Sequence, residues 1–257
     1  MNDYQILRLN DQNFKDLSVI YQSAFGTTPN LDELKKKFNT SSFSEKNVGF
    51  IAYQNSEPAA FYGVFPCYMT INGKQYLVCQ SGDTMTHENH RRKGLFIQLA
   101  KKTYELCESI GVNLVFGFPN ENSYPGFVKK LDWIHENNIY CYRINSFSIK
   151  RKFAAKYINN NKKYNTEFSN KYLESISCKF RDYISLNDSS NNNLIQRDQL
   201  FHNYKQYFKK YTLEINGKLI YLKPSKDYLF IGDIENCNSK ELKKIITELK
   251  KISNLLN

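Results

Sequence analysis

The chain has 257 residues, a formal net charge of +11 and 15% aromatic residues, which is enough for one large domain or two smaller ones with buried cores. Its six cysteines stand singly, neither they nor the four histidines have zinc-binding spacing, and no signal peptide or long apolar run is recognisable. We therefore expect no bound metal, no membrane association, and a reduced, soluble, cytoplasmic protein. Tyr and Phe are spread out rather than gathered on a basic platform, so we expect no nucleic-acid binding.

The first 149 residues alternate between strand and helix patterns. Apolar residues at helical spacing end at Gly26 and again at Gly111, and the Asn72–Gly73 pair predicts a tight hairpin between two strands. The expected elements, in chain order, are strand 4–9, helix 14–25, helix 31–38, strands 48–54, 59–71 and 76–86, helix 95–110, a fully buried strand 112–118, helix 124–131 and strand 139–149.

The remaining chain has a weaker pattern. Two asparagine-rich stretches, 159–161 and 187–193, indicate loops or linkers. A helical stretch at 199–208 is followed by a hairpin at Asn216–Gly217, a strand at 228–233 and an amphipathic helix that begins at Ser239. This order predicts a smaller α+β domain.

The stretch THENHRRKGLF, from Thr86 to Phe96, joins an alternating strand pattern to a helix pattern. A short basic loop and a glycine before a helix direct several backbone N–H groups at one point, where the helix dipole adds positive potential. Neither GxxxxGK[ST] nor GxGxxG occurs here. The stretch therefore predicts a pyrophosphate-binding loop that belongs to neither of these two motifs.

Two motifs resemble the GNAT superfamily of N-acetyltransferases. The run DTMTHENHRRKGLF at 83–96 is similar to D-T-x-V-H-P-x-Y-R-x-K-G-L-F, with Glu88 in place of Pro, and its Arg91–Gly94–Phe96 resembles R-x-x-G-x-small with a changed last position. FGFPNENSYPGFVKKLDW at 116–133 resembles the family's strand-Asn-helix segment, with Asp132 in place of Gly. The element order is also that of the family. The resemblance implies an α/β GNAT fold, a mixed central sheet flanked by helices.

The second half resembles the truncated GNAT-like half of two-domain members, on the run R-D-x-x-F-x-x-Y at 197–204. The resemblance implies a GNAT acyl-CoA-binding domain at 1–149 and a truncated GNAT-like α+β domain at 150–257. The second domain has no phosphate loop of its own, so we expect it to serve as a lid or acceptor site.

The co-substrate implied by this resemblance is acetyl-CoA or another short-chain acyl-CoA. The backbone of the strand before the loop would bind its pantetheine arm, the loop its pyrophosphate, and asparagines after the next strand the arm or the acceptor. Those asparagines could instead satisfy their own turn. The implied binding residues are Met85, Thr86, Arg91, Arg92, Lys93, Gly94, Leu95, Phe96, Asn120 and Asn122.

Acyl transfer to an amine needs a neutral nucleophile and a proton source for the leaving thiolate. Many family members use a tyrosine where this chain has Val128, so Tyr124, one turn earlier, is the candidate acid unless it merely caps its helix. Candidate bases are Asp83, His87 and Glu121, although His87 could equally be a solvent-facing loop residue. Proximity alone could also supply much of the acceleration.

The sequence leaves the acceptor open. The FPNExS phrase and the second domain resemble enzymes of sugar and polysaccharide pathways, which implies a nucleotide-linked amino sugar as acceptor. The charge of +11 would suit its diphosphate, but it could also reflect lysines that merely coat solvated faces. The alternatives are an antibiotic or polyamine acceptor, and a catalytically silent acyl-CoA-binding module. The oligomeric state also stays open, a homodimer included.

Overall fold

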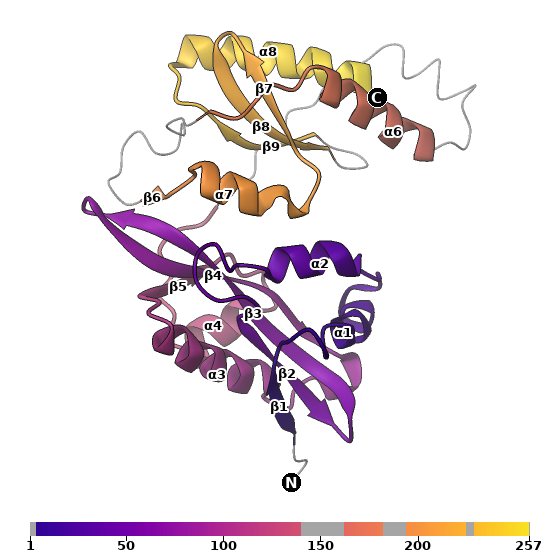
Figure 1. The fold of residues 1–257 in the computed structure, drawn as a ribbon, viewed down its shortest axis with the longest axis vertical. Helices are drawn as coiled ribbons and strands as arrows, with labels where there is room; N and C mark the ends of the chain where they lie inside the picture. Colours follow the sequence, from indigo (N-terminus) through magenta and orange to yellow (C-terminus); the bar gives the residue numbers. More distant parts are fainter. Residues whose placement is uncertain (1–3, 140–161, 182–193, 225–228, 257) are drawn as a thin grey trace. The chain divides into compact units, whose positions relative to one another are not determined.

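The chain forms two compact units, which Figure 1 shows in a computed structural model that describes residues 4–139, 162–181, 194–224 and 229–256. The first unit comprises Met1–Asn137 together with Asn192–Tyr207, and the second comprises Asn138–Asn191 and Phe208–Asn257. The chain therefore leaves the first unit, returns to it for one short segment and leaves it again. The predicted boundary between residues 149 and 150 lies outside the described residues and stays a prediction.

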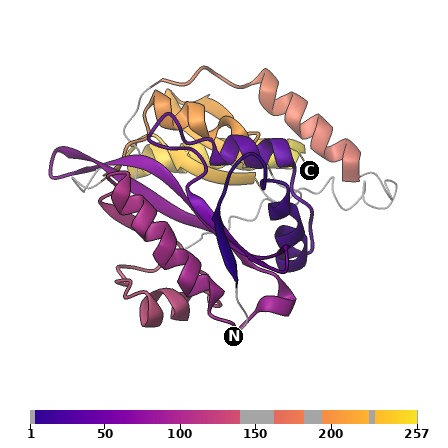
Figure 2. The ribbon, with the colours of Figure 1, turned by 60° about the horizontal axis from the view of Figure 1, so that its bottom comes forward.

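A mixed sheet forms the centre of the first unit (Figures 1 and 2). Its strand order is β1-β2-β3-β4-β5, with every neighbouring pair antiparallel except the parallel pair β4–β5, and the short β6 pairs with β3. This arrangement confirms the predicted α/β fold with a mixed sheet. The strands are β1 (Gln5–Arg8), β2 (Gly49–Gln54), β3 (Glu57–Ile71), β4 (Lys74–Thr86), β5 (Leu114–Gly117) and β6 (Leu194–Ile195).

Strand β3 lies between two hydrophobic cores. Ala60, Tyr62 and Val64 contribute to the core in which α3 and α4 pack, whereas Phe61 and Phe65 contribute to the core of α1 and α2. This is the two-residue period of a strand, so the apolar run is buried on both faces of the sheet. The helices are α1 (Asp16–Phe25), α2 (Leu31–Phe38), α3 (Leu95–Ser109) and α4 (Tyr124–Lys130).

Caps and turns follow the sequence signals. Asn30 precedes α2, and its side-chain oxygen accepts from two backbone N–H groups of the first turn. Gly26 ends α1 with a φ of 69°. Asn72 and Gly73 have φ values of 49° and 77°, so both turn residues are left-handed, as the predicted two-residue hairpin requires.

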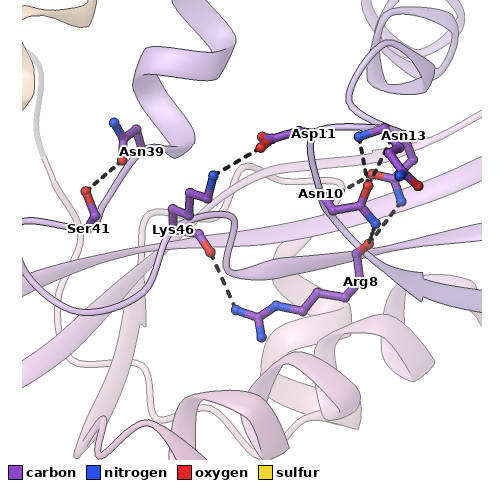
Figure 3. Close-up of polar contacts among 8 residues, drawn as sticks. Arg8, Asn10, Asp11, Asn13, Asn39, Ser41 and Lys46 are labelled. Atoms are coloured by element: carbon purple, nitrogen blue, oxygen red, sulfur yellow. Dashed lines mark hydrogen bonds and ion pairs between the residues drawn. The ribbon is translucent and has the colours of Figure 1, made fainter.

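A polar network fixes the connection from β1 to α1 (Figure 3). The Asn10 side-chain oxygen accepts from the Asn13 N–H at 3.2 Å, and the Asn13 side-chain oxygen accepts from the Asn10 N–H at 2.8 Å. The Asn13 amide donates to the Arg8 carbonyl at 3.0 Å, and Lys46 forms an ion pair with Asp11 at 3.1 Å. These contacts satisfy the backbone groups of an irregular segment.

The prediction of a fully buried strand at 112–118 is wrong. The strand covers Leu114–Gly117, and the side chains of Leu114 and Phe118 are 44% and 61% exposed. A continuous apolar run is typical of a strand buried on both faces of a sheet. Here β5 is the last strand of the described sheet, and the strand predicted at 139–149 lies outside the described residues.

In its described residues, the second unit has a three-stranded antiparallel sheet and two helices. The predicted hairpin at Asn216–Gly217, with φ values of 55° and 74°, and the helix that begins at Ser239 are confirmed. Helix α6 was not predicted, because its sequence is polar and only weakly periodic. Among the residues described, no helix is long and apolar enough to cross a membrane. The elements are α6 (Lys162–Ser175), β7 (Tyr211–Ile215), β8 (Lys218–Pro224), β9 (Leu229–Ile234) and α8 (Ser239–Leu256).

The returning segment, residues 194–207, is fastened to β3 and α2 of the first unit. It consists of β6, α7 (Gln199–Tyr204) and a 3-10 turn, η3 (Lys205–Tyr207). The Gln196 N–H donates to the Tyr68 carbonyl at 2.9 Å, and the Tyr204 hydroxyl donates to the Lys37 carbonyl at 2.8 Å. A chain cut after residue 149 would therefore lack part of the first unit.

Candidate active site

A β-bulge interrupts β4 where the loop motif begins. Phe61 pairs with Met85 and Gly63 with Gly82, so two residues of β4 stand opposite one residue of β3. Asp83, the first residue of the bulge, has a φ of 54°. Its carboxylate oxygens accept from the Lys37 ammonium of α2 at 2.6 and 2.7 Å. Among the three candidate bases, Asp83 is thus held in an ion pair that is largely shielded from solvent.

His87 and Glu88 connect the end of β4 to neighbouring elements. The His87 N–H donates to the Ala59 carbonyl at 2.8 Å, and its Nδ1 accepts from the Asn89 N–H at 3.3 Å. The Glu88 N–H donates to the Ser23 hydroxyl at 3.0 Å. His87 therefore caps a 3-10 turn, Glu88–His90, in addition to any role with substrate.

His90 is buried at the same turn. Its Nδ1 shares a hydrogen bond of 2.9 Å with the Tyr4 hydroxyl. Burial, followed by the charges of Lys93 and His87, lowers the pKa of the His90 imidazole below its usual value. A neutral His90 therefore anchors the basic loop to the start of β1.

The junction between the basic loop and α3 presents unpartnered backbone donors. Arg92 and Gly94 are left-handed, with φ values of 62° and 76°. Within the described chain, none of the five N–H groups from Arg92 to Phe96 donates to another protein group. Arg91, Arg92 and Lys93 are exposed around them. Unpartnered N–H groups at a helix start, surrounded by cationic side chains, fit a bound pyrophosphate.

Phe96 occupies the position where the motif usually has a small residue. Its ring lies 5.9 Å from that of Tyr62 and 5.0 Å from that of Phe127, and it packs against the core. A Cβ on Gly126 would lie only 2.6 Å from the Phe96 ring, so the absence of a side chain in α4 makes room for it. The Phe96 side chain therefore leaves its own N–H accessible at the junction.

Strands β4 and β5 stop pairing before β4 reaches the basic loop. Ser81 and Gly117 are the last residues that pair β4 with β5, while β4 continues to Thr86. From Gly82 onward, the edge of β4 that faces β5 has no strand partner among the described residues. Met85 and Thr86, the predicted contacts for the pantetheine arm, lie on this unpaired stretch. Their backbone is thus available on one edge.

A buried hydrogen-bond network, not anticipated from sequence, lies beside the end of the β4–β5 pairing. The Tyr62 hydroxyl contacts the Ser81 hydroxyl at 2.8 Å and the Tyr104 hydroxyl at 2.9 Å. The Trp133 indole N–H donates to the Tyr104 oxygen at 3.0 Å. Burial raises the pKa of the Tyr62 hydroxyl, so it stays protonated. The network fixes α3 and the residues after α4 against the last β4–β5 pair.

The asparagines after β5 do not behave alike. The Asn120 side-chain oxygen accepts from the N–H groups of Asn122 and Ser123 at 3.1 and 3.0 Å, so it serves its own turn. Glu121 and Asn122 are exposed. Asn120 therefore stabilises its own turn in this structure, which is one of the two roles that the sequence left open.

Tyr124, the candidate acid, has a partner that sequence reasoning missed. Its hydroxyl lies 3.1 Å from His135 Nδ1, and the two rings meet edge to face at 5.4 Å. His135 lies 11 residues downstream of Tyr124 and beyond the end of α4 at Lys130, so helical spacing does not bring the two side chains together. Val128, at the family's usual tyrosine position, is half-buried.

The returning segment closes a cavity of about 150 Å³ in the first unit. Its walls are mostly apolar and aromatic, its polar groups include two cations, and none of its lining residues is acidic. In the described part of the chain, no cluster of three His, Cys, Asp or Glu residues could hold a metal. The cavity is lined by Phe65, Pro66, Cys67, Gln80, Phe118, Ile195, Arg197, Phe201, Tyr204 and Lys205.

The mixed sheet, the bulge in β4 and the donor-rich start of α3 together define the class of an acyl-CoA-dependent N-acyltransferase. Residues 5–135 match the family model of the acetyltransferase (GNAT) domain. The chain belongs to this family and is an N-acyltransferase of the GNAT type. GNAT acetyltransferases use acetyl-CoA, and the loop–helix junction described above fits its pyrophosphate.

Three solved structures are similar to this chain at low sequence identity. An aminoglycoside acetyltransferase from an uncultured soil metagenomic sample is 15% identical, with a TM-score of 0.45 over 55% of this chain and 95% of that chain. A Trypanosoma brucei acetyltransferase is 16% identical, with a TM-score of 0.43 over 55% and 100%. Glucosamine-6-phosphate N-acetyltransferase from Arabidopsis thaliana is 12% identical, with a TM-score of 0.44 over 56% and 99%. A search of curated proteins gives no match. These similarities carry no argument about the substrate.

Proposed function

We propose that the protein transfers an acetyl or other short acyl group from coenzyme A to the amine of a nucleotide-linked amino sugar, as a step of polysaccharide biosynthesis. The observation that carries the coenzyme assignment is the set of five unpartnered N–H groups at the start of α3. Bound acyl-CoA supplies the activated thioester. The residues assigned to it are Met85, Thr86, Arg91, Arg92, Lys93, Gly94, Leu95, Phe96 and Asn122, with Asn120 shaping the turn beside them.

The acceptor assignment rests on charge. The chain carries a net charge of +11, and the cavity lining includes Arg197 and Lys205 without any acidic residue. Asp83, the nearest acidic candidate on β4, is already paired with Lys37. An aminoglycoside or polyamine is cationic and needs acidic partners. This balance favours an anionic acceptor over the antibiotic and polyamine alternatives.

Turnover with a panel of amines tests the proposal. The experiment measures thiol release from acetyl-CoA with nucleotide-linked amino sugars, free amino sugars, an aminoglycoside and a polyamine. We expect release with the nucleotide-linked sugars at the highest kcat/KM. Thiol release with none of the acceptors, although coenzyme A binds, would support the catalytically silent module instead. Preference for the aminoglycoside or polyamine would overturn the acceptor assignment.

For the proton transfers we propose Tyr124 as the acid that protonates the leaving thiolate of coenzyme A, with His135 orienting the Tyr124 hydroxyl. His87 and Glu121 stay proposed bases, and Asp83 acts with Lys37 as an ion pair at the bulge. Tyr124→Phe is expected to lower kcat by about 10²-fold, the usual size of a general-acid contribution, with little change in coenzyme A affinity.

The matched control for this variant is Tyr76→Phe in the β3–β4 hairpin, which removes a hydroxyl away from α4. Steady-state rates across pH check the assignment. His135→Gln should reduce kcat and shift the pH profile, because it changes the partner of the Tyr124 hydroxyl. An unchanged rate in Tyr124→Phe would leave water as the proton source.

A further inference from the structure

We propose that the cavity closed by the returning segment binds the phosphoryl group attached to the acceptor sugar, and that Lys205 determines this specificity. The inference rests on the proposed function, since it identifies the part of the acceptor that enters the site. The residues that close the cavity lie after residue 193, outside the 5–135 match to the acetyltransferase domain. They are thus an addition of this chain to the shared fold.

Lys205 is a cation held among aromatic rings. Its ammonium lies 5.3 Å from the ring centre of Phe201, 5.4 Å from that of Tyr204 and 5.7 Å from that of Tyr207. Attraction of the ammonium to the faces of these rings positions it without neutralising it. The rings also screen it from water, so an anion there would be bound in a medium of low effective dielectric.

Lys205 has no acidic partner. Among the described residues, no carboxylate lies within 4.0 Å of its ammonium, and its one hydrogen bond is to the Tyr207 hydroxyl at 3.5 Å. Asp83, the acidic residue whose charge reaches it, is held by Lys37. Burial lowers the pKa of the Lys205 ammonium to about 8. A cation kept in such surroundings is unfavourable unless an anion joins it.

The other lining groups suit a phosphoryl oxygen as well. Arg197 and Gln80, whose side chains carry N–H donors, also line the cavity, and the remaining lining is largely apolar. Burial raises the pKa of the Cys67 thiol to about 11, so this group stays neutral and adds no competing anion. The cavity therefore combines two cations with a neutral, water-poor wall.

Size restricts what enters. At about 150 Å³ the cavity is smaller than the roughly 300–1,000 Å³ of pockets that bury a drug-sized ligand. That volume takes a phosphoryl group, with or without part of a sugar ring, but not a whole nucleotide. A phosphate monoester and the sugar-linked phosphate of a nucleotide diphosphate share this chemistry. In the second case, the nucleoside would remain outside the cavity.

The test measures binding rather than turnover. The protein is first saturated with coenzyme A, so that the loop at α3 cannot bind the probe. Calorimetric titrations then compare glucosamine, glucosamine 1-phosphate and uridine diphosphate glucosamine. We expect the phosphorylated probes to bind at least tenfold more tightly than glucosamine. The ratio between the two phosphorylated probes distinguishes a monoester site from a nucleotide diphosphate site.

In Lys205→Met, we expect phosphorylated and unphosphorylated sugars to bind with about equal affinity, while the affinity for coenzyme A is unchanged. Lys205→Arg, which keeps the charge, should retain part of the preference for the phosphorylated probes. The matched control is Lys74→Met, an exposed lysine at the tip of the β3–β4 hairpin, which should keep the full preference. The inference would be overturned if wild type bound glucosamine as tightly as the phosphorylated probes. It would also be overturned if Lys205→Met kept the full preference for the phosphorylated probes.

The design separates this inference from the proposed function. Phosphate-selective binding without any thiol release would support the cavity assignment and contradict catalysis. Thiol release with equal binding of phosphorylated and free sugars would support catalysis and contradict the cavity assignment.

Discussion

Gly94→Pro is expected to weaken coenzyme A binding by at least about 100-fold. The substitution removes one of the five donors at the start of α3, and a donor to a charged group contributes about 1.5–3 kcal/mol. Proline also cannot adopt the φ of 76° found at Gly94, so the neighbouring donors would move. Calorimetric titration with coenzyme A measures the effect.

Gly111→Pro is the matched control for this experiment. Gly111 lies just past the other end of α3, has a φ of 81° and also loses a donor, to the Glu108 carbonyl. Its structural cost should be similar, and its coenzyme A affinity should stay near that of wild type. Arg91→Ala, which removes one exposed charge, should lose only about 1–2 kcal/mol of binding free energy. Normal affinity in Gly94→Pro would show that the loop is not the pyrophosphate site.

Lys205→Met is expected to stabilise the first unit at pH 7, by about 3.5 kcal/mol at most. The pKa of Lys205 falls from 10.5 to about 8 on folding, and one pKa unit corresponds to about 1.4 kcal/mol. The residual solvent contact of the ammonium and the lost ring contacts reduce the net gain. A lysine that destabilises the free protein is typical of a residue retained for function.

The sign of the pH dependence follows from proton uptake. Below pH 8 the lysine is protonated in both states, so wild type bears the full cost of the buried cation. Between about pH 8 and 10.5 the unfolded chain holds more protons than the folded chain, so wild-type stability rises relative to the variant. The advantage of Lys205→Met should therefore be largest at neutral pH and shrink above pH 8.

Urea unfolding followed by tryptophan fluorescence measures this prediction. Trp133 is the single tryptophan of the chain and packs against the core that contains α3, so it reports on the first unit. Lys74→Met should show no such pH-dependent difference. A Lys205→Met protein that is less stable than wild type at pH 7, with a difference independent of pH, would contradict a destabilising buried ammonium.

Much of the first unit could be predicted because its signals are local. Gly26 and the Asn72–Gly73 pair act through their own backbone, and the structure has them where the pattern placed them. The basic loop before α3 is likewise one continuous stretch. Such features depend on neighbours within a few residues, and these are visible in a sequence.

The candidate site was harder to predict because its contacts join distant residues. Asp83 is a reasonable free base by position, but a lysine 46 residues earlier pairs with it. Tyr124 and His135 meet across a helix and the segment that follows it. The cavity needs residues 195–205 to return beside β3, and no local pattern encodes that path. Tertiary packing, which decides these contacts, has no short-range signal.

The return of residues 192–207 to the first unit also has a consequence for biosynthesis. A ribosome that has synthesised Asn137 must add about 70 further residues before Tyr207 exists, which takes roughly 4–14 s at about 5–20 residues per second. Until then, Phe43, which packs against Tyr204, and the Met69–Thr70 edge of β3 have no cover from this segment. The nascent chain therefore passes through an interval in which most of the first unit exists but the segment that closes its cavity does not, and part of the apolar surface around β3 stays uncovered.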